Sequence, residues 1–220
     1  MSRIIIECGS GETCKNDKSI VRRMIDAIAK LDQGKHEIVY KWQLWLDPPV
    51  GSPPDLTQLD WLVFDYAYSY AEELGYQTTA SVFDRAATKL LLGYPIPFVK
   101  IAARREFYPL IDLVPRGVPV LASAPDFSTG ETLYSLWNVD VLYCIPQYPA
   151  SRTLYETTFG GGLYRGISDH TDSVELWHEY RPLVYEKHLK LEDSTGYDAG
   201  AHAALPEAFG TILAKDGGEL

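Results

Sequence analysis

The sequence predicts an α/β protein in which eight parallel strands and their helices close into a single (β/α)₈ barrel, a TIM barrel, with short or missing helices between strands five and seven. Short apolar runs alternate with amphipathic stretches along the 220 residues, a pattern typical of βα units around a parallel sheet. This length lies near the lower end of the barrel's size range. A doubly wound sheet is the rival fold, but Gly9-Ser10-Gly11 lacks the third glycine of its dinucleotide-binding turn.

Each expected element follows from the local apolar pattern. The strands are expected at 3–6, 37–42, 77–80, 97–102, 118–122, 139–144, 161–167 and 182–187. Helices are expected at 20–28, 59–74, 84–92, 107–113, 172–180 and 206–213, with a short one at 130–137 and little or none over 151–160. The apolar residues of the first expected helix recur at the 3.6-residue period of a helix face, which predicts an amphipathic helix. We expect residues 1–220 to form one domain.

Composition and charge argue against two classes of function, nucleic-acid binding and membrane insertion. The formal net charge of −10 argues against a nucleic-acid surface, which would be basic. No apolar run is long enough to span a membrane. The three cysteines form an odd set without zinc-site spacing, and Met1-Ser2-Arg3 leads directly into a strand. These features favour a reducing, cytoplasmic setting.

Polar side chains end every expected strand. Because the carboxyl ends of barrel strands meet at one mouth, these groups should converge there. They are Glu7, Lys41, Gln43, Ser81, Lys100, Ser123, Tyr148, Ser168, His170, Glu186 and His188. An unpaired lysine inside a buried strand would be costly, so Lys41 and Lys100 indicate an anionic ligand, a phosphate or a carboxylate. Arg104-Arg105-Glu106 is either a solvated loop or a further phosphate contact.

His170 and His188 follow two neighbouring strands and are candidates for a metal site. Two protein ligands leave several positions for water and substrate. Such a site suits Mn²⁺ or Mg²⁺ as well as Zn²⁺.

An ordered series of motifs resembles the N-acetylneuraminate (sialic acid) synthase family. IIIECGS at 4–10 resembles the family's IAEIGxNH, and YKWQ at 40–43 its VKFQ. ELG at 73–75 with ASVFD at 80–84, FVKIA at 98–102, PVLAS at 119–123 and YP at 148–149 are similar to ELG…STPFD, FKIAS, PVILST and YP. SDHT at 168–171 and EKH at 186–188 match the family's own motifs, and GYD at 196–198 stands in place of GPDH. The series covers nearly the whole chain.

The resemblance implies roles for these residues. His170 and His188 would bind a divalent metal, usually Mn²⁺, with Mg²⁺ as the alternative. Phosphoenolpyruvate would contact Lys41, Ser81, Lys100, Ser123 and Ser168. Glu7 would handle a proton or orient the substrates, and Glu186 would support it. Gln43, Arg105, Tyr148 and Asp198 complete the expected substrate-binding set.

The expected reaction joins phosphoenolpyruvate to a sugar-like aldehyde, giving a 2-keto acid of the nonulosonic type and phosphate. Such an enzyme is a transferase of carbohydrate biosynthesis. The acceptor positions depart from the family: Ala103 replaces a serine, Pro146 an asparagine and Gly11-Glu12 the early Asn-His pair. The family's C-terminal antifreeze-like domain is expected to be absent. The family's usual dimer relies on that domain, so a homo-oligomer is possible but is not predicted by the resemblance.

Two alternatives stay open. One is a metal-dependent barrel aldolase or lyase that uses pyruvate. The other is a non-catalytic barrel that binds a ligand, which the altered acceptor positions favour.

Overall fold

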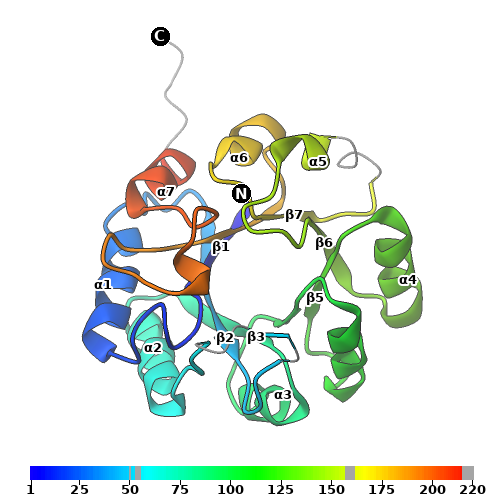
Figure 1. Ribbon diagram of the computed structural model, residues 1–220, viewed down its shortest axis with the longest axis horizontal. Coiled ribbons are helices and arrows are strands. Elements are labelled where there is room, and N and C mark those ends of the chain that lie inside the picture. The colour runs from blue at the N-terminus through cyan, green and yellow to red at the C-terminus, as the bar shows by residue number, and fades with distance from the viewer. Residues whose placement is uncertain (50, 53–55, 157–161, 215–220) are drawn as a thin grey trace.

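The computed structural model of the chain is a closed barrel of eight parallel strands, as the sequence predicts (Figure 1). It describes residues 1–49, 51–52, 56–156 and 162–214. The strands are β1 (Arg3–Glu7), β2 (Glu37–Leu44), β3 (Gln77–Val82), β4 (Val99–Ile101), β5 (Val120–Ala124), β6 (Asp140–Cys144), β7 (Gly166–Asp169) and β8 (Val184–His188). Strand β8 pairs with β1, placing His188 beside Glu7, and this pairing closes the barrel.

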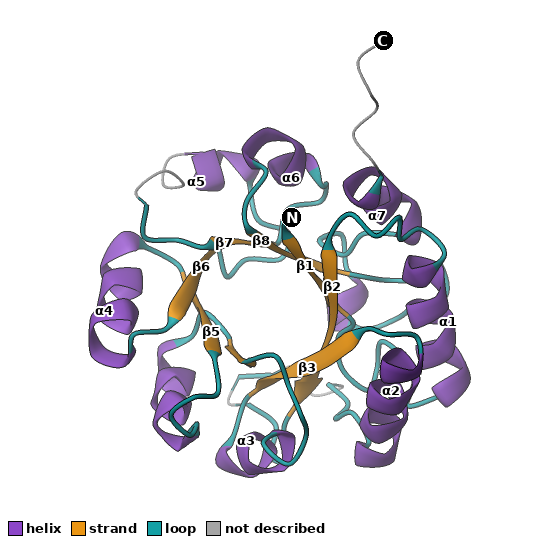
Figure 2. Ribbon diagram, turned by 180° about the vertical axis from the view of Figure 1, so that it is seen from behind, coloured by secondary structure: helices purple, strands orange, loops and turns teal. Residues whose placement is uncertain are grey.

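The helices form a ring outside the strands, which Figure 2 shows from the opposite side. They are α1 (Lys18–Ala29), α2 (Trp61–Glu73), α3 (Arg85–Leu91), α4 (Phe127–Trp137), α5 (Arg152–Glu156), α6 (Glu175–Tyr180) and α7 (Pro206–Leu213). Two 3₁₀ helices, η1 (Arg105–Leu113) and η2 (Tyr197–Ala199), complete the set. None of the helices within the described ranges is long and apolar enough to cross a membrane.

Aspartate side chains begin four of the helices. Each accepts a hydrogen bond from a backbone N–H in the first turn, a cap that stabilises a helix by about 1 kcal/mol. The capping residues are Asp17, Asp60, Asp84 and Asp126. These caps fix where the chain leaves each strand-end loop, and therefore the length of the loops around the barrel mouth.

Several elements differ from the sequence expectation; for example, α6 begins at Glu175 rather than at residue 172, and β4 covers Val99–Ile101 rather than 97–102. Helix α4 begins at Phe127 rather than at residue 130, because Asp126 accepts from the backbone N–H of Thr129 at 2.8 Å. The helix expected at 107–113 is the 3₁₀ helix η1, which contains Pro109; a proline has no N–H to donate to an α-helix. Strand β7 is shorter than expected and begins at Gly166, whereas its expected start, residue 161, lies outside the described residues. Residues 157–160, part of the segment in which little or no helix was expected, also lie outside the described residues.

The core has two parts on the two faces of the barrel wall. The larger part lies between strands and helices and includes Ile4, Ile6 and the α1 face predicted from the sequence. The smaller part fills the barrel interior as one apolar layer. That inner layer consists of Ile5, Val39, Phe98, Leu121, Leu142 and Val184.

Strands β7 and β8 pack closely at Gly166, and this close packing predicts the effect of a substitution there. A Cβ added there would lie 1.7 Å from the carbonyl oxygen of Val184, so Gly166→Ala forces the two strands apart. We expect it to lower the free energy of unfolding by about 3 kcal/mol, measured by urea denaturation.

Gly210→Ala in α7 is the matched control, since its added Cβ would lie 3.5 Å from the nearest atom, in Leu31. It should leave stability unchanged or raise it by up to about 1 kcal/mol. A Gly166→Ala protein as stable as the wild type would contradict this account of the β7–β8 contact.

Candidate active site

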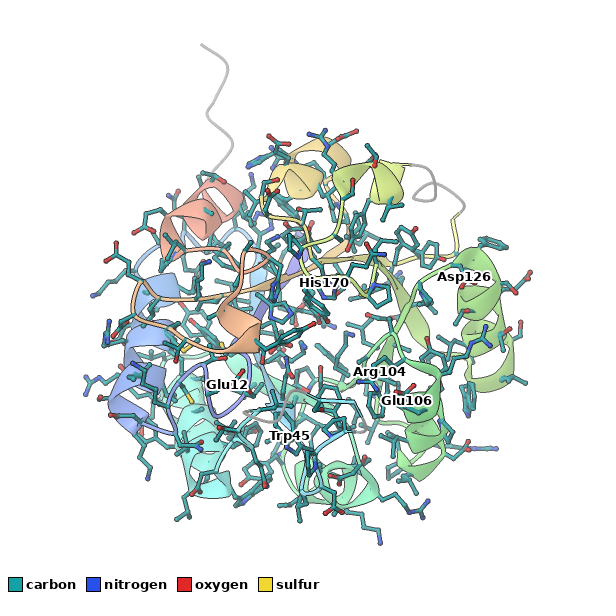
Figure 3. All side chains as sticks on the ribbon, in the orientation of Figure 1. Glu12, Trp45, Arg104, Glu106, Asp126 and His170 are labelled. Atoms are coloured by element: carbon teal, nitrogen blue, oxygen red, sulfur yellow. The ribbon has the colours of Figure 1, made fainter. Side chains whose placement is uncertain are left out.

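A cavity of about 420 Å³ opens at the carboxyl ends of the strands, where barrel enzymes build their sites. All eight strands contribute to its wall. The strand residues that line it are Glu7, Lys41, Gln43, Ser81, Lys100, Ser123, Cys144, Ser168, Glu186 and His188. Trp45, Arg104 and His170 line it too, and Figure 3 shows these three arranged around the barrel opening. Polar groups that end the strands therefore share one cavity.

The cavity floor is a polar layer stacked directly on the inner apolar layer. Side chains alternate across a strand, so the residue two positions further along faces the same interior. Two positions beyond the six apolar residues stand Glu7, Lys41, Lys100, Ser123, Cys144 and Glu186. All six line the cavity. The strand alternation thus explains why these groups meet without any loop having to place them.

Lys41 is buried and held by three partners on the floor. Its Nζ donates to Oε2 of Glu7 and, at 2.7 Å, to Oγ of Ser81. Oε2 of Glu186 lies 3.6 Å away. Burial lowers the pKa of Lys41 to about 8, although the charge of Glu186 opposes that shift. The side chain is therefore a buried cation held between two carboxylates.

Lys100 repeats this arrangement on the opposite side of Glu186. Its Nζ donates to Oγ of Ser123 at 2.7 Å and lies 3.8 Å from Oε1 of Glu186. Ser168 Oγ donates to the same Oε1 at 2.7 Å. Burial alone would raise the pKa of Glu186, but Lys100, Lys41 and Ser168 outweigh burial and hold it at about 2. Glu186 is thus an ionised carboxylate between two ammonium groups.

His170 stands above this floor in a fixed orientation. Its Nδ1 donates to the carbonyl oxygen of Ile145 at 2.8 Å, and its ring lies 4.3 Å from that of Tyr148. Behind it, the hydroxyl of Tyr155 in α5 accepts from the backbone N–H of His170 and donates to the carbonyl oxygen of Ser168. Burial lowers the pKa of His170 to about 3, so the imidazole is neutral near pH 7.

A group of three potential metal ligands lies at the mouth beside His170. His188, Asp198 and His202 are buried, and each offers a donor atom within 4.8 Å of the other two. The rings of His188 and His202 are 4.6 Å apart, and Nδ1 of His188 is 3.6 Å from Oδ1 of Asp198. Burial raises the pKa of Asp198 to about 6 and lowers that of His202 to about 4.

The loop after β8 carries Asp198 into the cavity. Gln43 of β2 donates to Oδ1 of Asp198 at 2.8 Å. Gly9, whose φ is +77°, lets the backbone approach closely, because a Cβ there would lie 2.9 Å from Cβ of Asp198. Glu12 accepts from the backbone N–H of Tyr197 at 2.5 Å. The first and last loops of the barrel are therefore joined at the site.

The structure places one residue of the expected set outside the cavity. Arg105 is exposed and is absent from the cavity wall, whereas Arg104 lines it. Ala102, Ala103 and Arg104 all line the cavity at a bend that follows β4, where the N–H of Arg104 donates to the carbonyl oxygen of Ala102 at 2.8 Å. Arg104, one position earlier in the chain, is therefore the arginine of this segment that lines the cavity.

Sequence reasoning also left His202 without a role. Its signal was its position four residues after Asp198 in the loop that replaces a family motif. The other expected residues all line the cavity: Glu7, Lys41, Gln43, Ser81, Lys100, Ser123, Tyr148, Ser168, His170, Glu186, His188 and Asp198.

Comparison with known proteins agrees with this architecture. Neither a protein-family model nor a curated protein sequence matches the chain. Among solved structures, spore coat polysaccharide biosynthesis protein E of Chromobacterium violaceum is similar at a TM-score of 0.75 and 19% identity, over 100% of this chain and 77% of the other. N-acetylneuraminic acid (sialic acid) synthetase of Leptospira borgpetersenii follows at 0.74 and 20%, over 96% of this chain and 80% of its own.

A truncated 3-deoxy-D-arabino-heptulosonate 7-phosphate synthase of Thermotoga maritima is also similar, with a TM-score of 0.64 and 11% identity, over 97% of this chain and 84% of the other. At these identities the likeness concerns the fold. The chain has a (β/α)₈ barrel like that of a sialic acid synthetase. The resemblance indicated by the motifs is therefore confirmed at the level of the fold.

The buried imidazoles predict how stability depends on pH. In the metal-free protein, the free energy of unfolding should fall between pH 7 and pH 5, because unfolded histidines with an ordinary pKa near 6.5 take up protons that buried ones do not. His170 alone should contribute about 2 kcal/mol to this fall. Asp198 offsets part of it, since its raised pKa lets the folded state bind a proton between pH 6 and 4.

Urea denaturation in a chelating buffer at pH 5, 6 and 7 measures the effect. His170→Asn, which keeps a donor for the Ile145 carbonyl, should show a smaller difference between pH 5 and 7 than the wild type. If the variant keeps the full difference, His170 is not a buried neutral imidazole.

Proposed function

We propose that the chain is a phosphoenolpyruvate-dependent synthase of the sialic acid synthase type, which joins phosphoenolpyruvate to a sugar-like aldehyde with the help of a divalent metal. The observation that carries this proposal is the floor of the cavity. There two buried lysines, each bonded to a serine, lie below a group of imidazole and carboxylate donors. One cavity thus offers an anion site and a cation site together.

The floor suits the phosphate and carboxylate of phosphoenolpyruvate. Lys41 and Lys100 supply ammonium donors, and Ser81, Ser123 and Ser168 supply hydroxyls. Charge-assisted hydrogen bonds to such groups are about twice as strong as neutral ones. Glu186 occupies the space between the lysines in the ligand-free chain. We infer that an entering anion replaces part of the contacts that Glu186 makes with the two lysines.

The donors at the mouth fit a divalent cation. His188, Asp198 and His202 each have a buried polar atom without a hydrogen-bond partner in the described structure, and an ion would satisfy all three. His170 and His188 are the pair that the family resemblance assigns to the metal. When bound, the ion would supply Lewis-acid polarisation of the acceptor's carbonyl oxygen.

The proposed reaction forms one C–C bond and replaces the bond from carbon 2 to the phosphate oxygen by a bond from carbon 2 to the oxygen of water. Carbon 3 of phosphoenolpyruvate attacks the aldehyde carbon, and the acceptor oxygen takes up a proton. Water adds to carbon 2 and gives up one proton, and the tetrahedral adduct then expels phosphate, which takes the remaining hydroxyl proton, to leave a 2-keto acid. Glu7, held by the N–H of Gly9 and by Lys41, is placed to accept the proton from water. The lysines stabilise the phosphate and carboxylate charges throughout.

The acceptor would lie at the outer end of the cavity. Trp45, Phe83, Tyr148 and Tyr197 line this part with aromatic surface, and Arg104 adds a cation. Aromatic rings offer the flat apolar surfaces on which sugar rings pack. The shared fold of the sialic acid and heptulosonate phosphate synthases supports the choice of a sugar-like acceptor.

Removing one floor lysine tests the donor half of the proposal. Lys100→Met should weaken phosphoenolpyruvate binding by roughly 10- to 100-fold, because one to two charge-assisted hydrogen bonds are lost. Titration calorimetry measures it, and Lys89→Met, an exposed lysine of α3, is the control. The milder Ser123→Ala should weaken binding less. Wild-type binding by Lys100→Met would refute the proposed anion site.

Phosphate release tests the reaction itself. The protein with Mn²⁺, phosphoenolpyruvate and a panel of sugar aldehydes should release one phosphate for each 2-keto acid formed, and Glu7→Gln should slow release by at least 100-fold. Turnover with pyruvate but not with phosphoenolpyruvate would instead identify an aldolase or lyase. Ligand binding without turnover on a broad panel would favour a non-catalytic barrel.

A further inference from the structure

We propose that His188, Asp198 and His202 bind one divalent metal ion together, so that the metal centre has three protein ligands and His202 is one of them. Neither the motifs nor the family resemblance assigns this role to His202. The ion's part in the reaction rests on the proposed function, whereas its binding by these three residues does not.

Unpaired polar atoms point to a missing ligand. Nδ1 of His188, Oδ2 of Asp198 and Nε2 of His202 are all buried, and none has a hydrogen-bond partner within the described structure. A buried polar group left without a partner costs about 1 to 3 kcal/mol, so three in one place call for a common partner. The set contains two imidazole nitrogens and one carboxylate oxygen, which are metal-binding groups.

The spacing of the donors suits a single ion. All three residues offer atoms within 4.8 Å of one another. Donors around one ion with bonds of about 2.1 Å lie roughly 3 to 3.5 Å apart. Side-chain shifts of about an ångström would therefore bring them to one centre.

His170 stands beside this group but has a different environment. Its Nδ1 donates to the carbonyl oxygen of Ile145, and Sγ of Cys144 lies 3.7 Å from Nδ1 and 4.0 Å from Nε2. Its ring is 5.5 Å from that of His188 and 6.2 Å from that of His202. His202 is closer to His188, at 4.6 Å. The geometry therefore pairs His188 with His202 more closely than with His170.

The loop after β8 is built to hold His202 in place. Ala204 donates to the carbonyl oxygen of His188 and accepts from the N–H of Lys190, so the chain returns to the end of β8. Nζ of Lys190 donates to the carbonyl oxygen of Gly200 at 2.8 Å. Gly200 leaves room for the imidazole, since a Cβ there would lie 3.1 Å from Nδ1 of His202. In Figure 1 this loop is the orange segment that crosses in front of the barrel wall near β1.

The donor set indicates which ions should bind. Imidazole nitrogens suit Fe²⁺ or Zn²⁺, the carboxylate oxygen suits Mn²⁺ as well, and Mg²⁺ prefers an all-oxygen set. Three protein ligands leave further positions open for substrate oxygens. Because two of the three ligands lie in the loop after β8, metal binding should also tie this loop to the barrel.

The test measures Mn²⁺ binding to the full chain after chelation, with no substrate present. Titration calorimetry should show one ion bound, and His202→Asn should weaken its affinity at least tenfold. Electron spin-echo modulation of the bound Mn²⁺ should show two coordinated imidazoles in the wild type, one in His202→Asn, and two still in His170→Asn. His178→Asn, which alters an exposed histidine of α6, is the control and should bind as the wild type does.

Different results would overturn the assignment. If His202→Asn keeps the wild-type affinity and both imidazole signals while His170→Asn loses one, the ion lies between His170 and His188. A wild-type chain that binds no Mn²⁺, Fe²⁺ or Zn²⁺ would also refute it. Because His170→Asn tests the same point, the proposal stays testable even if His202→Asn fails to fold. Failure of phosphate release with intact three-ligand binding would refute only the proposed function.

Discussion

The site depends on burying two positive and two negative side chains together inside the barrel. Lys41, Lys100, Glu7 and Glu186 are each at most 4% exposed, and any one of them alone would carry a penalty of several kcal/mol. They are tolerated because the closed barrel sets them in contact with one another and with serine hydroxyls. The apolar layer beneath keeps water out from below, so that the anion of the proposed reaction would meet donors whose positions are already fixed.

The sequence predicts the barrel and its floor well, because both follow from strand periodicity. A residue such as Lys41 or Ser123 faces the interior once its strand is located, whatever the loops do. Arg104 rather than Arg105 lines the cavity, because the chain bends after β4 in a way that strand periodicity does not predict. The prediction was incomplete at His202, because the path of a loop that folds back onto β8 is set by tertiary contacts such as Lys190 with Gly200.

The cavity separates two kinds of chemistry by depth. The floor presents ammonium and hydroxyl groups, and the mouth presents imidazoles and Asp198. The motifs that resemble the synthase family lie mostly on the floor, where strand geometry constrains each position. Departures such as Pro146 and Ala103 lie at the outer end, where side chains can vary without disturbing the buried charges. In the proposed synthase, acceptor preference would therefore change while the donor half is kept.

The bonds that join the last loop of the barrel to its first loop and to β2 have a consequence for how the protein assembles. Glu12 meets Tyr197 across 185 residues of chain, and Gln43 meets Asp198 across 155. Contacts that close such long stretches of chain form late in folding. The pairs of Lys41 with Ser81 and Lys100 with Ser123 need only the first five strands. These bonds can form before the barrel closes, whereas Glu186 meets the two lysines, and His188 meets Asp198, only after β8 has joined β1.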